Sequence, residues 1–176
     1  MLLGMNDPVA GIRGMFAEAA RELELAQAKD ELLAELTTRR LMLGLVRPPV
    51  LKPLGRVWRL GVLLLAHDGA VFATGTITRV TETNRPTFQS LAAEERRSYR
   101  ALAVRSGLPM GETVNFNAEA IVLEETALSE ADGPLFLRDG EPFVRWSHSL
   151  GSEVTMNLND YLRDRVELLT DPPAGA

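Results

Sequence analysis

The residue types best suited to chemistry gather in the segment ETVNFNAEAIVLEE, positions 112–125. Asn115, Asn117 and Glu119 alternate there with apolar residues, a period of two that predicts a half-buried strand with its polar side chains on one face. Two amides and a carboxylate on a rigid strand could orient a small polar ligand, and Glu119 could act as a general base if water were excluded from it. The alternative is a strand whose polar face meets solvent, although asparagine is disfavoured in strand centres.

A second set of reactive side chains lies in RWSHSLGS, which begins at Arg145. His148 follows Ser147 in a loop after a predicted strand, a position where functional groups are often displayed. A serine activated by His148, with Glu119 or Asp160 orienting the imidazole, would follow the logic of a catalytic triad. An exposed histidine among turn-forming serines is the alternative interpretation.

Arginine offers a third chemistry, because its guanidinium can hold a carboxylate through two parallel hydrogen bonds. Lys29 and Lys52 are the only lysines among the 19 basic residues, so the chain is rich in arginine. Arg59 and Arg145 are the candidate carboxylate clamps. A GC-rich genome that encodes arginine in place of lysine would explain the same bias.

The motifs that define common enzyme sites are absent: there is no phosphate-binding loop, dinucleotide-binding glycine pattern, nucleophile elbow or zinc-protease motif. With no cysteine and two histidines, the chain is expected to hold no metal and no cofactor. A net charge of -5 argues against a nucleic-acid partner. Without an apolar run of about 20 residues or a leader sequence, we predict a cytoplasmic protein with no membrane partner.

Two Asp-Gly pairs indicate how the strands are connected, because Asp-Gly between β-like runs predicts a two-residue hairpin turn. The first pair lies in HDG, positions 67–69, and would make the histidine a residue that flanks a turn. The second pair, at positions 139–140, would set Phe136 opposite Phe143.

The first turn also determines a strand register. A two-residue turn places Ala66 opposite Val71, which puts apolar residues on one face and threonines on the other. The same register, continued outward, places Trp58 opposite Arg79, where a cation–π contact is expected.

The N-terminal segment has helical periodicity. Asp7 can cap the first free amides, and Pro8 fits the first helical position. An apolar stripe follows at intervals of three or four residues: Val9, Ile12, Phe16, Ala19, Leu23 and Ala26. A second line of leucines, between positions 25 and 43, lies on a different face. We therefore predict a long N-terminal helix, or a helix pair with a break near residues 28–30.

Further helices are predicted at positions 89–107, with Ser90 as N-cap, and near the C-terminus after a cap at Asn157 or Asn159. Together with the hairpins, these helices predict an α+β fold. Its core would be a mostly antiparallel sheet of about five strands with two Asp-Gly hairpins, flanked by helices.

Three prolines in RPPVLKPLG, positions 47–55, break the helical pattern and suggest a boundary. We therefore predict an N-terminal helical segment at 1–46 and an α+β domain at 47–170. Residues 171–176 are expected to form a disordered tail.

Three stretches resemble a small actinobacterial family of uncharacterised proteins, some of which carry the name glutaminase. They are GRVWRLGVLLLAHDGAVFATGTITRV, RPTFQSLAAEERRSYRALAVRSG and GETVNFNAEAIVLE, and the similarity covers roughly residues 47–172. The resemblance implies a compact cytoplasmic bacterial domain. Serine-dependent glutaminases use a serine–lysine pair that this sequence lacks, and a cysteine nucleophile is ruled out, so no catalytic residue is carried over.

Two functions of different class follow. The first is a module that binds a small polar ligand or a protein partner, with a homodimer through the N-terminal helix. Its candidate ligand-binding residues are Asn115, Asn117, Arg145 and Arg59. The alternative is a small amidohydrolase, glutaminase-like, that acts on a polar amide through Ser147, His148 and Glu119.

Overall fold

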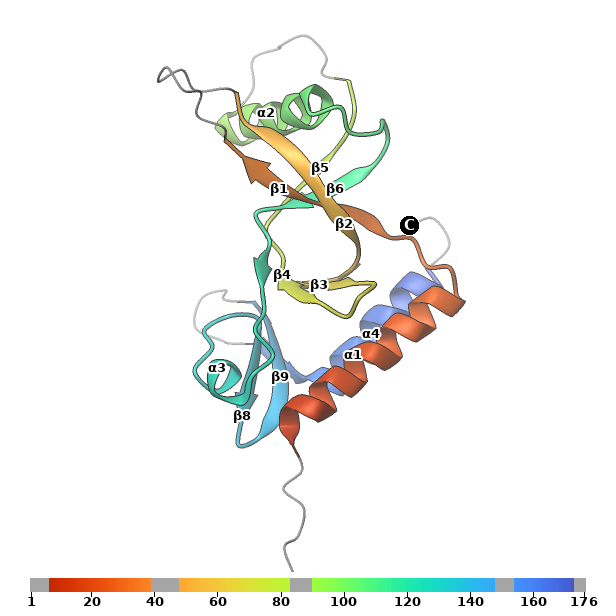
Figure 1. Cartoon of the computed structure of the whole chain (residues 1–176), viewed down its shortest axis with the longest axis vertical. Coiled ribbons are helices and arrows are strands. Elements are labelled where there is room, and N and C mark those ends of the chain that lie inside the picture. The colour runs from red at the N-terminus through yellow and green to blue at the C-terminus, as the bar shows by residue number, and fades with distance from the viewer. Residues whose placement is uncertain (1–6, 39–47, 83–89, 148–153, 173–176) are drawn as a thin grey trace, which may run out of the picture. The chain divides into compact units, whose positions relative to one another are not determined.

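The computed structural model describes residues 7–38, 48–82, 90–147 and 154–172 (Figure 1). Across these residues the fold is α+β, as predicted, with four helices and ten strands where about five strands were expected. The helices are α1 (Pro8–Leu25), α2 (Leu91–Arg105), α3 (Glu125–Ser129) and α4 (Leu158–Thr170). The predicted tail lies outside the described residues from position 173 onward.

The described strands form two sheets. The larger has the order β5-β6-β1-β2-β3-β4-β7 and is mostly antiparallel, although β1 and β6 pair in parallel. Its strands are β1 (Glu31–Thr37), β2 (Val50–Leu60), β3 (Leu63–Ala66), β4 (Val71–Ala73), β5 (Thr76–Arg79), β6 (Thr113–Phe116) and β7 (Glu119–Ala120). The smaller has the order β10-β9-β8, from β8 (Leu135–Arg138), β9 (Glu141–Ser147) and β10 (Val154–Asn157).

The chain folds into two compact units, each assembled from stretches that are separated in the sequence. Unit 1 combines residues 1–30, 58–73 and 119–176, and unit 2 combines residues 31–57 and 74–118. Strand β2 therefore contributes its first part to unit 2 and its last three residues to unit 1.

Helix α1 begins as the sequence predicts. The Asp7 side chain accepts a hydrogen bond of 2.9 Å from the amide of Val9, and Pro8 occupies the first helical position. Four residues of the apolar stripe, Ile12, Phe16, Ala19 and Leu23, are buried in the unit 1 core, where α1 packs against α4 (Figure 1). Val9 is also buried, whereas Ala26, just after the helix, is exposed. A homodimer through this helix stays a prediction.

The prediction that the helix continues beyond residue 30 is wrong, because α1 ends at Leu25. The Ala28 amide donates to the carbonyl of Leu23, and the Gln27 amide donates to that of Glu24. This is the paired hydrogen-bond pattern that closes a helix with one left-handed residue, and Gln27 takes that place with φ of 51°. Glycine usually occupies such a position, so the sequence carried no signal for it.

Replacing Gln27 with glycine should therefore stabilise the protein. A side chain in the left-handed region costs about 1–2 kcal/mol, and the extra freedom of glycine in the unfolded chain offsets part of the gain. We expect the free energy of unfolding to rise by about 0.5–1 kcal/mol in urea denaturation. Gln27→Ala, which keeps the strain, should show no gain, and a glycine variant less stable than wild type would contradict this account.

Residues 31–37 form strand β1 in place of the predicted second helix. Their partners are distant in sequence: Leu36 lies opposite Leu51 of β2, and Leu33 lies beside Asn115 of β6. Leucine and glutamate favour helix only weakly, and pairing on both edges overrides that preference.

Unit 2 packs α2 against the strands β5, β6, β1 and the first part of β2. Ser90 is the N-cap of α2, as predicted, although its side chain makes no capping hydrogen bond. Ser106, at the other end, accepts from the Leu51 amide at 2.8 Å and donates to the Leu102 carbonyl at 2.7 Å. This hydroxyl ties the end of α2 to β2. The unit 2 core consists of Ala34, Leu51, Val80, Leu102, Ala103, Leu108, Val114 and Phe116.

The turn around Asp68 has a register that differs by one residue from the predicted one. Leu65, not Ala66, lies opposite Val71, and the Ala66 amide donates to the Ala70 carbonyl at 2.8 Å. The loop therefore has three residues, 67–69. The Asp68 carboxylate accepts from the Ala70 amide at 3.0 Å and stabilises this wider loop.

The predicted pairing of Trp58 with Arg79 is also wrong. Strand β5 pairs with β6, so that Arg79 lies opposite Thr113, and the Arg79 Nε donates to the Gly111 carbonyl at 3.2 Å. Between β8 and β9, Arg138 lies opposite Glu141, and its guanidinium lies 5.3 Å from the ring of Phe136.

Candidate functional site

The predicted polar face of Asn115, Asn117 and Glu119 does not form a single strand. Asn117 has φ of 53°, in the left-handed region that asparagine tolerates better than most residues, and it separates β6 from β7. Asn115 belongs to unit 2, whereas Glu119 belongs to unit 1. The prediction of one shared binding face on one continuous strand is therefore wrong.

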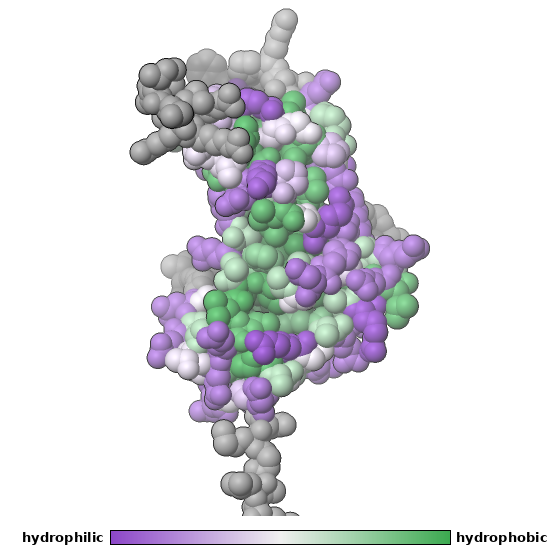
Figure 2. All heavy atoms as spheres, in the orientation of Figure 1, coloured by the Kyte–Doolittle hydropathy of each residue, from purple (hydrophilic) through white to green (hydrophobic). Residues whose placement is uncertain are grey.

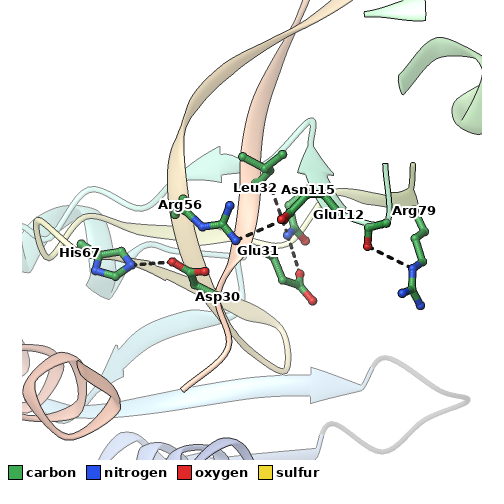
Figure 3. A network of polar contacts seen from close by, with 9 residues as sticks. Asp30, Glu31, Leu32, Arg56, His67, Arg79, Glu112 and Asn115 are labelled. Carbon is green, nitrogen blue, oxygen red and sulfur yellow. Dashed lines mark hydrogen bonds and ion pairs between the residues drawn. The ribbon is translucent and has the colours of Figure 1, made fainter. Parts of the chain in front are cut away.

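Asn115 is fully buried and holds the sheet of unit 2 together (Figure 3). Its Nδ2 donates to the Glu31 carboxylate at 2.7 Å and makes a longer contact of 3.4 Å to the Leu32 carbonyl. Because this amide links β6 to β1, its role is structural, and no side-chain surface is left for a ligand. Asn117 is exposed, and its amide lies 3.4 Å from the Thr76 hydroxyl.

The sequence predicts that His67 flanks a two-residue turn, whereas in the structure it is the first residue of the three-residue loop. It also joins a cluster that the sequence did not indicate (Figure 3). In unit 1 its Nε2 lies 3.1 Å from Asp30 Oδ2 and its Nδ1 lies 3.5 Å from a Glu24 carboxylate oxygen. The ring lies 4.0 Å from that of Trp58, whose Nε1 donates to the carbonyl of Ala28. These contacts tie the hairpin to the end of α1.

No group of three histidine, aspartate or glutamate side chains in the described part of the chain is arranged to hold a metal ion. The carboxylates around His67 therefore act as its hydrogen-bond and ion-pair partners in this geometry.

The Arg145 guanidinium donates to backbone carbonyls of its own chain and is not available to bind a carboxylate as predicted. Its Nη1 donates to the carbonyls of Asp132 and Gly133, both at 3.0 Å, and its guanidinium lies 4.3 Å from the Phe136 ring. Arg59 is half-buried in β2 and is engaged by other residues of the chain. The structure thus assigns both arginines to internal contacts.

The predicted triad is only partly described. Ser147 is the last residue of β9, opposite Val154 of β10, and His148 lies outside the described residues. Asp160, in the first turn of α4, forms an ion pair of 2.8 Å with Arg163. The association of Ser147 and His148 with Glu119 therefore stays a prediction.

Glu119 lies at a pocket of about 250 Å³ in unit 1. All but one of the lining residues come from the segment 119–135, and the other is Ala73 of β4. Most lining side chains are small or aliphatic, and Glu119 is the ionisable residue among them. Figure 2 shows hydrophobic side chains gathered over this part of the molecule.

Two arginines fix the wall of this pocket on either side of α3. The Arg13 guanidinium, from α1, donates to the Leu123 carbonyl at 2.9 Å, just before α3. Arg145 holds the carbonyls of Asp132 and Gly133 just after it. Leu128 of α3 is buried in the unit 1 core and anchors the helix between them. The segments on either side of α3 are thus tied to α1 and β9.

The small residues explain why the space exists. Ala120, Ala127, Ala131 and Gly133 present little volume, so the walls meet without filling the interior. Sequence periodicity identified Glu119 but not this cavity, because a pocket depends on which side chains are missing from a packed surface.

No protein-family model, curated protein or solved structure matches this chain. The resemblance to the actinobacterial family and the glutaminase name therefore stay predictions. Among the described helices, none has both the length and the apolar character needed to cross a bilayer.

Proposed function

We propose that this protein is a binding module that takes a small, mainly apolar molecule with a positively charged amine. The observation that carries the proposal is the pocket around Glu119, whose lining is apolar except for this carboxylate. Binding sites for small molecules combine an apolar wall with a few polar groups that fix orientation. A carboxylate at an apolar wall favours a cationic partner, because a charge-assisted hydrogen bond satisfies it.

The size of the pocket restricts the ligand. Its volume of about 250 Å³ lies just below the usual range for ligand pockets, so the occupant is smaller than a nucleotide or a typical cofactor. The sequence predicts a polar ligand bound by Asn115. Such a ligand is less compatible with the structure than an amine at Glu119, because the Asn115 side-chain amide already donates a hydrogen bond to the Glu31 carboxylate. Among the residues that the structure describes, the pocket lining includes neither serine nor histidine, so the proposal rests on binding.

Three six-carbon probes test the role of the charge: n-hexylamine, n-hexanol and hexanoate. We expect hexylamine to bind about three- to fivefold more tightly than hexanol in a titration followed by ligand-observed NMR, since an ion pair with an exposed carboxylate such as Glu119 contributes at most about 1 kcal/mol. Hexanoate should bind most weakly, because its charge repels Glu119. Glu119→Gln should remove the preference for the amine.

Two further variants serve as controls. Glu130→Gln changes an exposed carboxylate that does not line the pocket, and it should leave the preference intact. Ala131→Leu fills the pocket and should weaken binding of all three probes. Equal affinity for the three probes, or a preference that survives in Glu119→Gln, would refute the proposed function. Native mass spectrometry of protein purified from cells would then identify any retained ligand.

A further inference from the structure

Strand β7 lies at an edge of the larger sheet and forms part of the Glu119 pocket. It is last in the strand order, and among the described strands it pairs with β4 alone. Both of its residues, Glu119 and Ala120, are exposed and line the pocket. The edge of a sheet presents backbone amides and carbonyls to which an extended chain can pair.

The pairing with β4 shows which backbone groups of β7 face outward. The Ile121 amide donates to the Val71 carbonyl at 2.9 Å, and Ala120 lies opposite Phe72 in an antiparallel ladder. In such a ladder, the backbone groups of every second residue point toward the partner strand. Because Ile121 points its amide at β4, the amide and carbonyl of Ala120 point away from β4, to the other side of β7.

We propose that the Glu119 pocket binds the N-terminus of a peptide or protein chain whose first residue is apolar. This inference rests on the proposed function, because the α-amino group is the positively charged amine that pairs with Glu119. The first side chain lies against the small and aliphatic wall, and the backbone that follows extends the sheet beside Ala120. A volume of about 250 Å³ is below that of most sites for drug-sized ligands and suits a single side chain.

The position of the amine sets the direction of the bound chain. With its first residue beside Glu119 and its second beside Ala120, the peptide runs parallel to β7. In a parallel ladder, the Ala120 amide donates to the carbonyl of the first peptide residue, and the Ala120 carbonyl accepts from the amide of the third. The amide of the second residue points away from β7. A simple alkylamine makes neither of these two backbone hydrogen bonds.

The tetrapeptide Leu-Ser-Ala-Ser-amide is the probe, titrated against the full chain by ligand-observed NMR. At about pH 6.5 its α-amino group is charged, because the pKa of such a group is about 7.7–8.0. We expect the peptide to bind about tenfold more tightly than n-hexylamine, since two backbone hydrogen bonds add to the ion pair. The N-acetylated peptide should bind about fivefold more weakly than the free peptide.

Two N-methylated forms of the peptide make a matched pair that tests the backbone pairing. A methyl group on the amide of the third residue removes the hydrogen bond to the Ala120 carbonyl and should weaken binding about fivefold. A methyl group on the amide of the second residue, which points away from β7, should change the affinity by less than about twofold. Equal weakening by the two methyl groups would show that the peptide does not pair with Ala120 and would overturn the proposal.

Protein variants and the alkylamine separate this inference from the proposed function. Glu119→Gln should remove the difference between the free and the acetylated peptide, whereas Glu130→Gln, an exposed carboxylate outside the pocket, should keep it. If hexylamine binds through Glu119 but the peptide binds no more tightly than hexylamine, this inference fails and the proposed function stands. If neither hexylamine nor the peptide binds, both fail. A peptide whose affinity is unchanged by acetylation also overturns the inference.

Discussion

Replacing Gly75 with alanine is expected to lower the free energy of unfolding by more than about 3 kcal/mol, or to prevent folding. Gly75 lies in unit 2 between β4 and β5, where the chain passes directly against the end of β6. A Cβ atom at this position would overlap the carbonyl groups of Phe116 and Asn117. Because the obstructing atoms belong to the backbone, no side-chain rotation can relieve the overlap.

Gly55→Ala is the matched control for this prediction. Gly55 also belongs to unit 2, in β2, and a Cβ atom there would meet nothing within 4 Å. Its free energy of unfolding should stay within about 0.5 kcal/mol of wild type. Urea denaturation of both variants makes the comparison, and similar stability in the two would show that β6 does not approach Gly75 as closely as described.

Features that depend on a few neighbouring residues could be predicted from the sequence. The start of α1 follows from Asp7 and Pro8, because capping and the proline constraint act within one turn. Helix α4 begins after Asn157, whose side chain accepts from the Asn159 amide at 2.9 Å. Ser90 likewise marks the start of α2.

Features that depend on pairing between distant residues could not be predicted from the sequence. The leucine-rich sequence of β1 suits a helix. The segment forms a strand because it pairs with β2 on one edge and β6 on the other. Strand β5 was assigned to the nearest available partner, whereas its actual partner, β6, lies more than thirty residues further along. Periodicity shows which face of a segment is apolar, but it does not show which segment covers that face.

The candidate site likewise combines a feature that the local sequence predicts with features that depend on distant residues. Alternation of polar residues correctly drew attention to Glu119, but the strand that would have joined it to Asn115 is broken at Asn117. The pocket itself depends on Arg13 and Arg145, which hold backbone carbonyls on both sides of α3. Neither arginine lies within ten residues of Glu119, so no local pattern could have linked them.

Replacing Tyr161 with phenylalanine is the second change with a large expected effect. The buried hydroxyl donates to the Leu60 carbonyl at 2.8 Å and accepts from the Val62 amide at 3.0 Å. It spans the tight turn at Gly61, whose φ of 64° suits glycine and where a Cβ atom would overlap the same hydroxyl. Loss of the hydroxyl leaves two backbone groups without a partner, which costs about 2–3 kcal/mol.

Tyr99→Phe is the matched control, because Tyr99 is the only other tyrosine and its hydroxyl donates to the exposed Glu95 side chain at 2.8 Å. We expect a change of at most about 0.5 kcal/mol for this variant. If the two tyrosine variants were equally stable in urea, the turn at Gly61 would not depend on the Tyr161 hydroxyl.

The pH dependence of stability gives an independent test of Tyr161. Burial raises the pKa of Tyr161 above its ordinary value of 10.0, although the Val62 amide and the Arg165 guanidinium act in the opposite direction. As pH rises, the unfolded chain therefore loses this proton first, and ionisation favours unfolding. The stabilisation is complete below about pH 10 and is lost as pH rises through the folded-state pKa. Wild type should thus lose stability more steeply above about pH 10 than Tyr161→Phe. The pKa of Tyr99 is also raised, mainly by the hydrogen bond that its hydroxyl donates to Glu95. Tyr99→Phe should therefore reduce the slope too, but less than Tyr161→Phe, because solvent screens the exposed Tyr99–Glu95 pair.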